Sequence, residues 1–176
     1  VKDTDGKVYR TVAINDQLWM AENLNKDIDN SFCYNNVSEN CDMYGRLYSW
    51  SGAMDSAGVY STNGKGCGLE SDCTPTYPVR GICPEGWHLP DTTEWKHLVN
   101  SIDNVAALQA RIVKIWDNAT DASGFSVLYL GDRWSPAAFW TSIDRRYWRI
   151  GNEDAGEEYG SVVKHTVRCI ENEEGE

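Results

Sequence analysis

The sequence predicts an α+β domain, and three observations support this fold class. Apolar side chains at helical spacing occur earlier in the chain, whereas the last third consists of short alternating segments typical of antiparallel strands. This segregation of helices from strands is characteristic of α+β domains. The third observation is the presence of six cysteines among 176 residues, which indicates covalent ties across long loops. We expect one domain over residues 1–170, followed by an acidic tail or linker at 171–176.

The N-terminal segment is expected to begin with a turn and a hairpin. The D-T-D-G run at 3–6 resembles the start of a calcium-binding loop, but the twelfth position counted from Asp3 is Ile14 instead of the required Glu. A turn is therefore the better interpretation. Strands are predicted at 8–14 and 18–24, joined by a short turn.

Three segments between the hairpin and the later strands are predicted to be helical. In residues 43–57, Leu47, Trp50, Ser51 and Met54 have helical spacing and would form an aromatic buried face. Residues rich in Gly, Ser, Thr and Pro then indicate a long loop over 58–78.

The second predicted helix covers residues 91–102. Asp91 and Glu94 are three residues apart, as in a capping box, and the apolar residues that follow share one face. Another helix is expected from Val105 to about Lys114, with Asp103 as a possible cap.

The last third is expected to form a series of short strands. They are separated by turns rich in Gly, Asp and Glu, of which the longest is an acidic turn at 152–160. The predicted strands cover residues 124–130, 137–143, 146–151 and 162–170.

The cysteine spacing favours disulfides over a metal site. Cys33 and Cys41 lie eight residues apart, Cys67 and Cys73 lie six apart, and Cys83 and Cys169 would remain as a long-range pair. Six cysteines allow about fifteen pairings, so this pairing is a preference. Zinc is the rival interpretation, but no C-x2-C pair occurs and the three histidines are scattered. Disulfides in turn indicate an oxidising compartment, so an extracellular or cell-surface location is expected.

The charge of the chain disfavours several classes of partner. The formal net charge is −11 and the isoelectric point about 4.7, so phosphate backbones and anionic lipid surfaces would repel this chain. No apolar stretch approaches the ~20 residues that a membrane-spanning helix needs. We therefore expect neither nucleic-acid binding nor membrane insertion by this segment.

The strongest signal for binding is the density of aromatic and arginine residues between Gly131 and Asn152. Aromatic rings stack on sugar rings, and Arg, Asp and Asn side chains hydrogen-bond to hydroxyl groups; the same mixture is typical of protein-interface hot spots. Strand alternation divides the set, so one of its faces is expected to be core, and Trp140 is expected to be buried. The candidate ligand-binding residues are Asp132, Arg133, Trp134, Arg145, Arg146, Tyr147, Trp148 and Asn152.

Catalytic and metal-binding alternatives have weaker support. None of the histidines is flanked by a nucleophile motif, and His88 is expected to be a core histidine bonded to a backbone carbonyl. The acidic turn could supply paired carboxylates for glycoside hydrolysis, or oxygen ligands for Ca²⁺ from Glu153, Asp154 and Glu157. An exposed acidic turn is the simpler interpretation, and no cofactor is expected.

Several motifs in order carry a resemblance to a known family. The runs D-T-D-G-K-V-Y-R-T-V-A-I, C-Y-N-N, Y-G-R-L-Y-S-W, C-P-E-G-W-H-L-P-D-T-T-E-W, S-G-F-S, F-W-T-S and V-R-C-I are similar to those of the Fibrobacter succinogenes major paralogous domain. The resemblance spans residues 3–170. It implies a C-type-lectin-like fold, with two helices packed on a twisted antiparallel sheet, long loops and export to the cell surface.

For function, the resemblance implies a surface or secreted protein involved in adhesion or polymer binding. Our leading hypothesis is a non-catalytic binding module that recognises plant-cell-wall or other polysaccharide, or a partner protein. One alternative is a structural subunit or decoration of a surface appendage, which could form homo-oligomers; another is a carbohydrate-active enzyme that uses the acidic turn. The calcium-dependent sugar motifs of true C-type lectins, E-P-N or Q-P-D followed by W-N-D, do not occur in this sequence.

Overall fold

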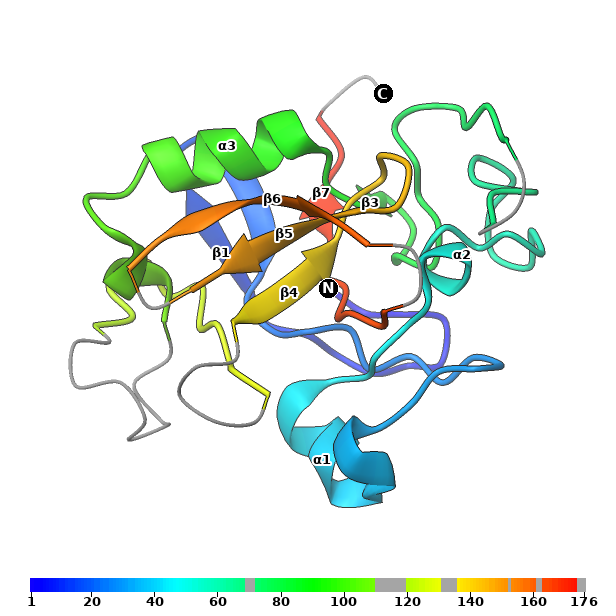
Figure 1. Ribbon diagram of the computed structural model, residues 1–176, viewed down its shortest axis with the longest axis horizontal. Coiled ribbons are helices and arrows are strands. Elements are labelled where there is room, and N and C mark those ends of the chain that lie inside the picture. The colour runs from blue at the N-terminus through cyan, green and yellow to red at the C-terminus, as the bar shows by residue number, and fades with distance from the viewer. Residues whose placement is uncertain (69–71, 110–119, 131–135, 152, 161–162, 174–176) are drawn as a thin grey trace.

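Two antiparallel sheets form the centre of the molecule in the computed structural model (Figure 1), which describes residues 1–68, 72–109, 120–130, 136–151, 153–160 and 163–173. Within these residues, one sheet has four strands in the order β1-β2-β7-β3 and the other has three in the order β4-β5-β6. The strands are β1 Thr11–Ile14, β2 Gln17–Met20, β3 Trp87–His88, β4 Ala137–Trp140, β5 Arg146–Ile150, β6 Ala155–Tyr159 and β7 Ile170–Glu171.

Short helices lie at the edges of the two sheets (Figure 1). The α-helices are α1 Ser38–Tyr44, α2 Trp50–Ala53 and α3 Thr92–Asn100, and two 3₁₀ turns cover η1 Tyr34–Asn36 and η2 Val105–Leu108. The α+β class and the antiparallel pairing agree with the prediction, whereas the one sheet that was expected is divided into two. Within the described residues, no helix is long and apolar enough to cross a membrane.

The N-terminal hairpin forms where it was predicted. β1 pairs with β2 in antiparallel register from Thr11 opposite Met20 to Ile14 opposite Gln17. Asn15 in the turn adopts a left-handed φ of 55°, a conformation that Asn tolerates better than most residues. The preceding D-T-D-G run is a turn, because Asp3 Oδ1 accepts hydrogen bonds from the backbone N–H groups of its own loop.

Helix α3 confirms the predicted capping box. The Asp91 carboxylate accepts hydrogen bonds from the N–H groups of Thr93 and Glu94, and the Glu94 side chain accepts one from the N–H of Asp91. Trp95 and Leu98 on the inner face of the helix are buried. This helix covers one side of the three-stranded sheet (Figure 1).

The single helix predicted over 43–57 is wrong. It is replaced by α1 and α2, because α1 ends at Gly45, whose φ is +75° and where a Cβ atom would lie 2.8 Å from the carbonyl oxygen of Leu24. The chain after Gly45 is extended, with Leu47 bridged to Phe32 and Tyr48 bridged to His165. Long-range backbone pairing therefore overrides the helical spacing of the side chains.

Other predicted elements also differ from the structure. The helix predicted from Val105 is only the 3₁₀ turn η2, with Asn104 rather than Asp103 before it, and residues 110–114 of the prediction lie outside the described residues. The strand at 124–130 is reduced to one bridge between Gln109 and Val127. Most of the acidic turn at 152–160 is the strand β6, because its residues pair with β5.

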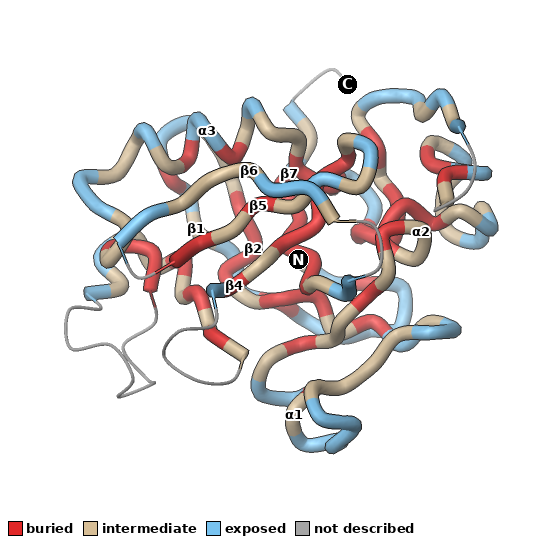
Figure 2. The backbone as a smooth tube through the Cα atoms, in the orientation of Figure 1, coloured by how far each residue is buried: buried red, intermediate tan, exposed pale blue. Residues whose placement is uncertain are grey.

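Figure 2 shows the buried residues in red along the central strands, and many of their side chains are aromatic. Trp95 is at the centre of this aromatic core, with ring centroids 4.8 Å from Trp19, 5.2 Å from Phe139 and 5.9 Å from Phe125. Trp140 is fully buried, as predicted, and its Nε1–H donates to the Tyr48 carbonyl at 2.7 Å.

The three disulfides have the predicted pairing. Cys33 is bonded to Cys41, Cys67 to Cys73 and Cys83 to Cys169. The first two close short loops. The third joins two cysteines that are 86 residues apart, one in the segment before β3 and the other directly before β7. It therefore links two neighbouring strands of the four-stranded sheet.

Candidate binding groove

The two faces of β5 have different surroundings. Trp148 and Ile150 point to one face, which is core; Trp148 is 4% exposed and its ring is stacked on Trp95 with centroids 6.1 Å apart and 6° between the planes. Trp148 was predicted to contact a ligand, but its ring is not available to one. The alternation of β5 thus places this tryptophan against α3.

The other face of β5 carries Tyr147 and Arg149, together with their β4 partners Trp140 and Ala138. Tyr147 is half-buried, and its ring centroid lies 4.1 Å from that of His165. His165 in turn packs edge-on against Trp140 with centroids 4.6 Å apart. This row of rings forms one wall of a cavity on the sheet.

We call this cavity of about 280 Å³ the sheet groove. Its lining combines aromatic and cationic side chains with an apolar floor. The polar and aromatic lining residues are Tyr34, Tyr147, Arg149, Lys164, His165 and Thr166. A pocket of this composition can stack on the flat face of a ligand ring and donate hydrogen bonds at its edge.

Burial keeps the His165 imidazole neutral. It lowers the pKa of His165 from its ordinary 6.5 to about 4, because the charged form would lose its hydration. The Nε2 atom of His165 is buried and has no hydrogen-bond partner among the described residues. Burial also raises the pKa of Tyr147, so its hydroxyl stays protonated and can donate at neutral pH.

The arginines of this region are held by the acidic residues that were predicted to form a separate site. Arg149 donates to both carboxylate oxygens of Asp154, at 3.0 and 2.6 Å, and to Glu158 at 3.4 Å. Arg146 pairs with Glu157 at 3.1 Å. The β5–β6 pairing therefore joins the arginines and the acidic turn into one ladder of ion pairs.

This ladder changes the interpretation of the calcium candidates. The Arg149 hydrogen bond holds the pKa of Asp154 below its usual value, and Glu157 is bonded to Arg146, so both carboxylates already have cationic partners. Glu153 is exposed. Within the described part of the chain, no group of three or more His, Cys, Asp and Glu side chains could hold a metal ion.

Other predicted site residues fall at the edge of the groove or outside the described residues. Arg145 lies in the β4–β5 turn with a left-handed φ of 51° and pairs with the neighbouring Asp144 at 2.8 Å. Four candidates lie outside the described residues, namely Asp132, Arg133, Trp134 and Asn152. Among the predicted ligand contacts that the structure describes, Tyr147 alone lines the groove.

A second cavity, of about 300 Å³, lies beside the sheet groove and was not predicted from the sequence. We call it the N-terminal pocket. Tyr9, Arg10, Met43 and Tyr44 line it, and Leu128 lines both cavities. Met43 is 63% exposed. No sequence signal pointed to this surface, because its lining comes from segments far apart in the chain.

The side chain of Arg168 is fully buried at this pocket without a carboxylate partner among the described residues. It donates to Asn23 Oδ1 at 3.1 and 2.6 Å and to the carbonyl oxygen of Phe125. Its guanidinium carbon lies 4.4 Å from the centroid of the Phe125 ring. Burial lowers the pKa of Arg168 to about 9, and the carbonyl and amide oxygens compensate for part of the lost hydration.

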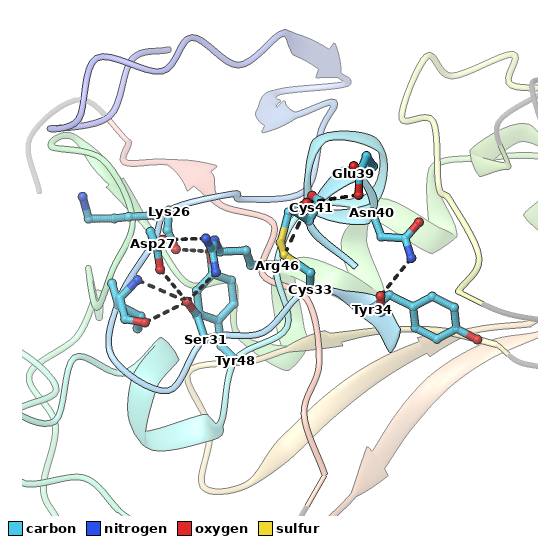
Figure 3. Close-up of a disulfide and its surroundings, with 12 residues drawn as sticks. Lys26, Asp27, Ser31, Cys33, Tyr34, Glu39, Asn40, Cys41, Arg46 and Tyr48 are labelled. Atoms are coloured by element: carbon cyan, nitrogen blue, oxygen red, sulfur yellow. Dashed lines mark hydrogen bonds and ion pairs between the residues drawn. A yellow bond between two sulfur atoms is a disulfide. The ribbon is translucent and has the colours of Figure 1, made fainter. Parts of the chain in front are cut away.

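The segment between the two cavities is stapled by the Cys33–Cys41 disulfide (Figure 3). Tyr34, directly after Cys33, lines the sheet groove, and Tyr44 at the end of α1 lines the N-terminal pocket. Asn40 Nδ2 donates to the Tyr34 carbonyl at 2.8 Å, which fixes the start of the segment. Figure 3 shows the Tyr34 ring extending away from the sulfur atoms.

A third depression, of about 660 Å³, is a weaker candidate. Two of its carboxylates already have structural roles. Asp55 accepts hydrogen bonds from the backbone N–H groups of residues 59–61, and Asp27 pairs with Arg46 at 2.6 Å, as Figure 3 shows. Tyr60 is the only aromatic residue in its described lining.

The histidine in the C-P-E-G-W-H-L-P run has side-chain partners rather than the predicted backbone carbonyl. His88 is buried, with Nε2 2.8 Å from Glu94 Oε1 and Nδ1 2.8 Å from Asn172 Oδ1. It therefore joins α3 to the residue after β7. His97 Nε2 lies 2.9 Å from Asp16 Oδ1, and all six cysteines are disulfide-bonded.

The fold and the groove together define a class of protein: a disulfide-stapled α+β domain that presents an aromatic pocket on an antiparallel sheet. Residues 12–170 match the model of the Fibrobacter succinogenes major domain, so the chain belongs to that family. Comparison with curated proteins and with solved structures gave no significant match.

Proposed function

We propose that this chain is a non-catalytic extracellular binding module that attaches to plant-cell-wall or other polysaccharide through the sheet groove. The observation that carries the proposal is the row formed by Tyr147 and His165 beside Tyr34 on a rigid sheet face. Sugar rings bind to such surfaces by stacking on aromatic faces, and side chains fixed by a sheet lose little conformational entropy on binding.

Two further features support this proposal. Three disulfides suit a protein that works outside the cell, where thiols are oxidised. Two carboxylates of the acidic turn that a hydrolase could use are already paired, Asp154 with Arg149 and Glu157 with Arg146. Asp154 is a poor general acid, because its hydrogen bond with Arg149 lowers the pKa of the carboxyl and favours the ionised form.

We also propose that the domain is a variant of the C-type-lectin-like fold. The supporting features are the family membership, the α+β architecture, and the long-range disulfide Cys83–Cys169 near the end of the chain. In this proposal the ligand surface lies among the later strands, as it does in the sheet groove. An experimental structure that superimposes on no C-type-lectin-like domain would contradict it.

Pull-down on insoluble cellulose and xylan tests the binding function. We expect the native protein to be retained and Tyr147→Ala to be released, whereas Tyr147→Phe, which keeps the ring, should be retained. Tyr159→Ala is the matched control, because Tyr159 is 57% exposed and lies on β6 outside the groove. Retention of Tyr147→Ala at the native level, or no binding to any polysaccharide, would overturn the proposal.

A further inference from the structure

The sheet groove and the N-terminal pocket have a common wall. Leu128 lines both cavities. The rings of Tyr34 and Tyr44, one from each cavity, are in contact edge to face with centroids 6.4 Å apart. Tyr34 lies inside the loop that the Cys33–Cys41 disulfide closes, and Tyr44 follows this loop. The stapled segment therefore contributes to the lining of both cavities.

The lining of the sheet groove is cationic, although the chain as a whole carries a formal charge of −11. Arg149 and Lys164 line it, and no Asp or Glu is among its described lining residues. Arg149 is neutralised by Asp154 and Glu158. Lys164 is exposed and has no carboxylate partner among the described residues, and its Nζ lies 3.0 Å from the centroid of the Phe32 ring.

The N-terminal pocket also contains cationic residues. Three line it, Lys7, Arg10 and Arg168, against two acidic ones, Glu22 and Asp42. Arg10 is paired with Glu22 at 2.9 Å, and Arg168 is fully buried with its donors bonded to Asn23 and to a backbone carbonyl. The exposed Lys7 is therefore the cation of this pocket that a ligand can meet, so each of the two adjoining cavities offers one lysine to an anionic ligand.

We propose that the ligand is an acidic glycan, a chain of uronic-acid sugars, and that it lies across both cavities. This inference rests on the proposed polysaccharide binding and specifies its chemical class. The carboxylates of the sugars meet Lys164 in the groove and Lys7 in the N-terminal pocket. A chain that occupies both cavities binds more tightly than a short fragment in one, because its second contact is intramolecular.

The test is calorimetric titration with oligogalacturonides and with neutral cello-oligosaccharides, each as a disaccharide and as a hexasaccharide, with EDTA present. We expect the acidic hexasaccharide to bind about tenfold or more tightly than both the neutral hexasaccharide and the acidic disaccharide, a difference of about 1.4 kcal/mol or more. Affinity for the acidic chain should fall as salt rises.

Substitutions of two exposed residues test the preference for acidic chains and the effect of chain length separately. Lys164→Gln should remove most of the preference for acidic over neutral chains, whereas Lys96→Gln on the exposed face of α3 should preserve it. Met43→Ala at the rim of the N-terminal pocket should remove most of the gain with chain length. Equal binding of acidic and neutral hexasaccharides would overturn the inference but leave polysaccharide binding intact, whereas no binding of either kind would overturn both.

Discussion

At the scale of single residues, burial separates the tryptophans that build the fold from the side chains that can meet a ligand. Trp95 and Trp148 stack within the core at a centroid distance of 6.1 Å. Tyr147, the neighbour of Trp148 in β5, faces the groove. Adjacent residues of one strand thus serve packing and binding, because successive side chains point to opposite faces.

Trp148→Ala is expected to destabilise the fold strongly. Removing the ring leaves a cavity beside Trp95, and substitutions of this kind cost about 3–5 kcal/mol of unfolding free energy. Urea denaturation of the native and variant proteins measures the change. The exposed Tyr159 provides the control, since Tyr159→Ala should change stability by less than about 0.5 kcal/mol. A similar small loss for Trp148→Ala would contradict the buried stacking.

His165 is expected to make stability depend on pH. Its pKa in the folded state is about 4, below the ordinary 6.5, so the unfolded chain binds more protons between these values. The contribution of the neutral His165 side chain to the unfolding free energy is therefore complete above pH 6.5, and it is lost as the pH falls toward 4. Urea unfolding at several pH values should show a shallower decline for His165→Gln than for the native protein. The exposed His97 provides the control variant His97→Gln, and identical slopes for native and His165→Gln proteins would refute the account.

At the scale of elements, local signals specify α3 and the N-terminal hairpin, whereas long-range pairing specifies the β6 strand. The capping box of α3 uses residues three positions apart, so the sequence alone locates its start. The segment 155–159 has a composition typical of a turn, yet it is a strand because its backbone pairs with β5. Arg146 and Arg149 of β5 also bond to its carboxylates.

Asp91→Ala is expected to lower the unfolding free energy by about 0.5–2 kcal/mol, because the N–H groups of Thr93 and Glu94 lose their acceptor. Asp91→Asn, which keeps an acceptor oxygen, should cost less. Thermal or urea unfolding of both variants measures the difference. Equal losses for Ala and Asn would show that the cap contributes through charge alone and not through the hydrogen bonds described here.

At the scale of the whole molecule, the disulfides divide into two short staples and one long-range tie. Cys83–Cys169 joins positions 86 residues apart, whereas Cys67–Cys73 closes a loop of separation 6. Together with the bond between His88 and Asn172, the long tie holds the C-P-E-G-W-H-L-P-D-T-T-E-W run against the C-terminal strand. That run is a structural clasp, and the candidate site lies elsewhere.

Removing the Cys83–Cys169 disulfide is expected to lower the unfolding free energy more than removing Cys67–Cys73. In the chain-entropy account, loss of Cys83–Cys169 costs about 4.6 kcal/mol and loss of Cys67–Cys73 about 2.5 kcal/mol. Double Cys→Ala substitution of each pair, followed by urea unfolding, measures both values. A larger loss for the short loop would show that strain or residual structure outweighs chain entropy in this fold.

The sequence was sufficient for the features that depend on local spacing and on residue type. The α+β class, the hairpin, α3, the disulfide pairing and the burial of Trp140 could all be predicted. The groove could not, because its lining comes from segments far apart in the chain, such as Tyr34, Tyr147 and His165. Single-strand alternation placed Tyr147 and Arg149 on one face, but only the folded structure shows which face is open.

The central claim is that a glycan binds on the open face of β4 and β5. The most direct test is an NMR titration of the isotopically labelled protein with soluble oligogalacturonide or xylo-oligosaccharide. The account predicts that shifts of backbone amides concentrate around Tyr34, Tyr147 and His165, and extend to Met43 with longer chains. Shifts confined to the depression around Asp55 and Tyr60, or an absence of shifts with every glycan, would contradict it.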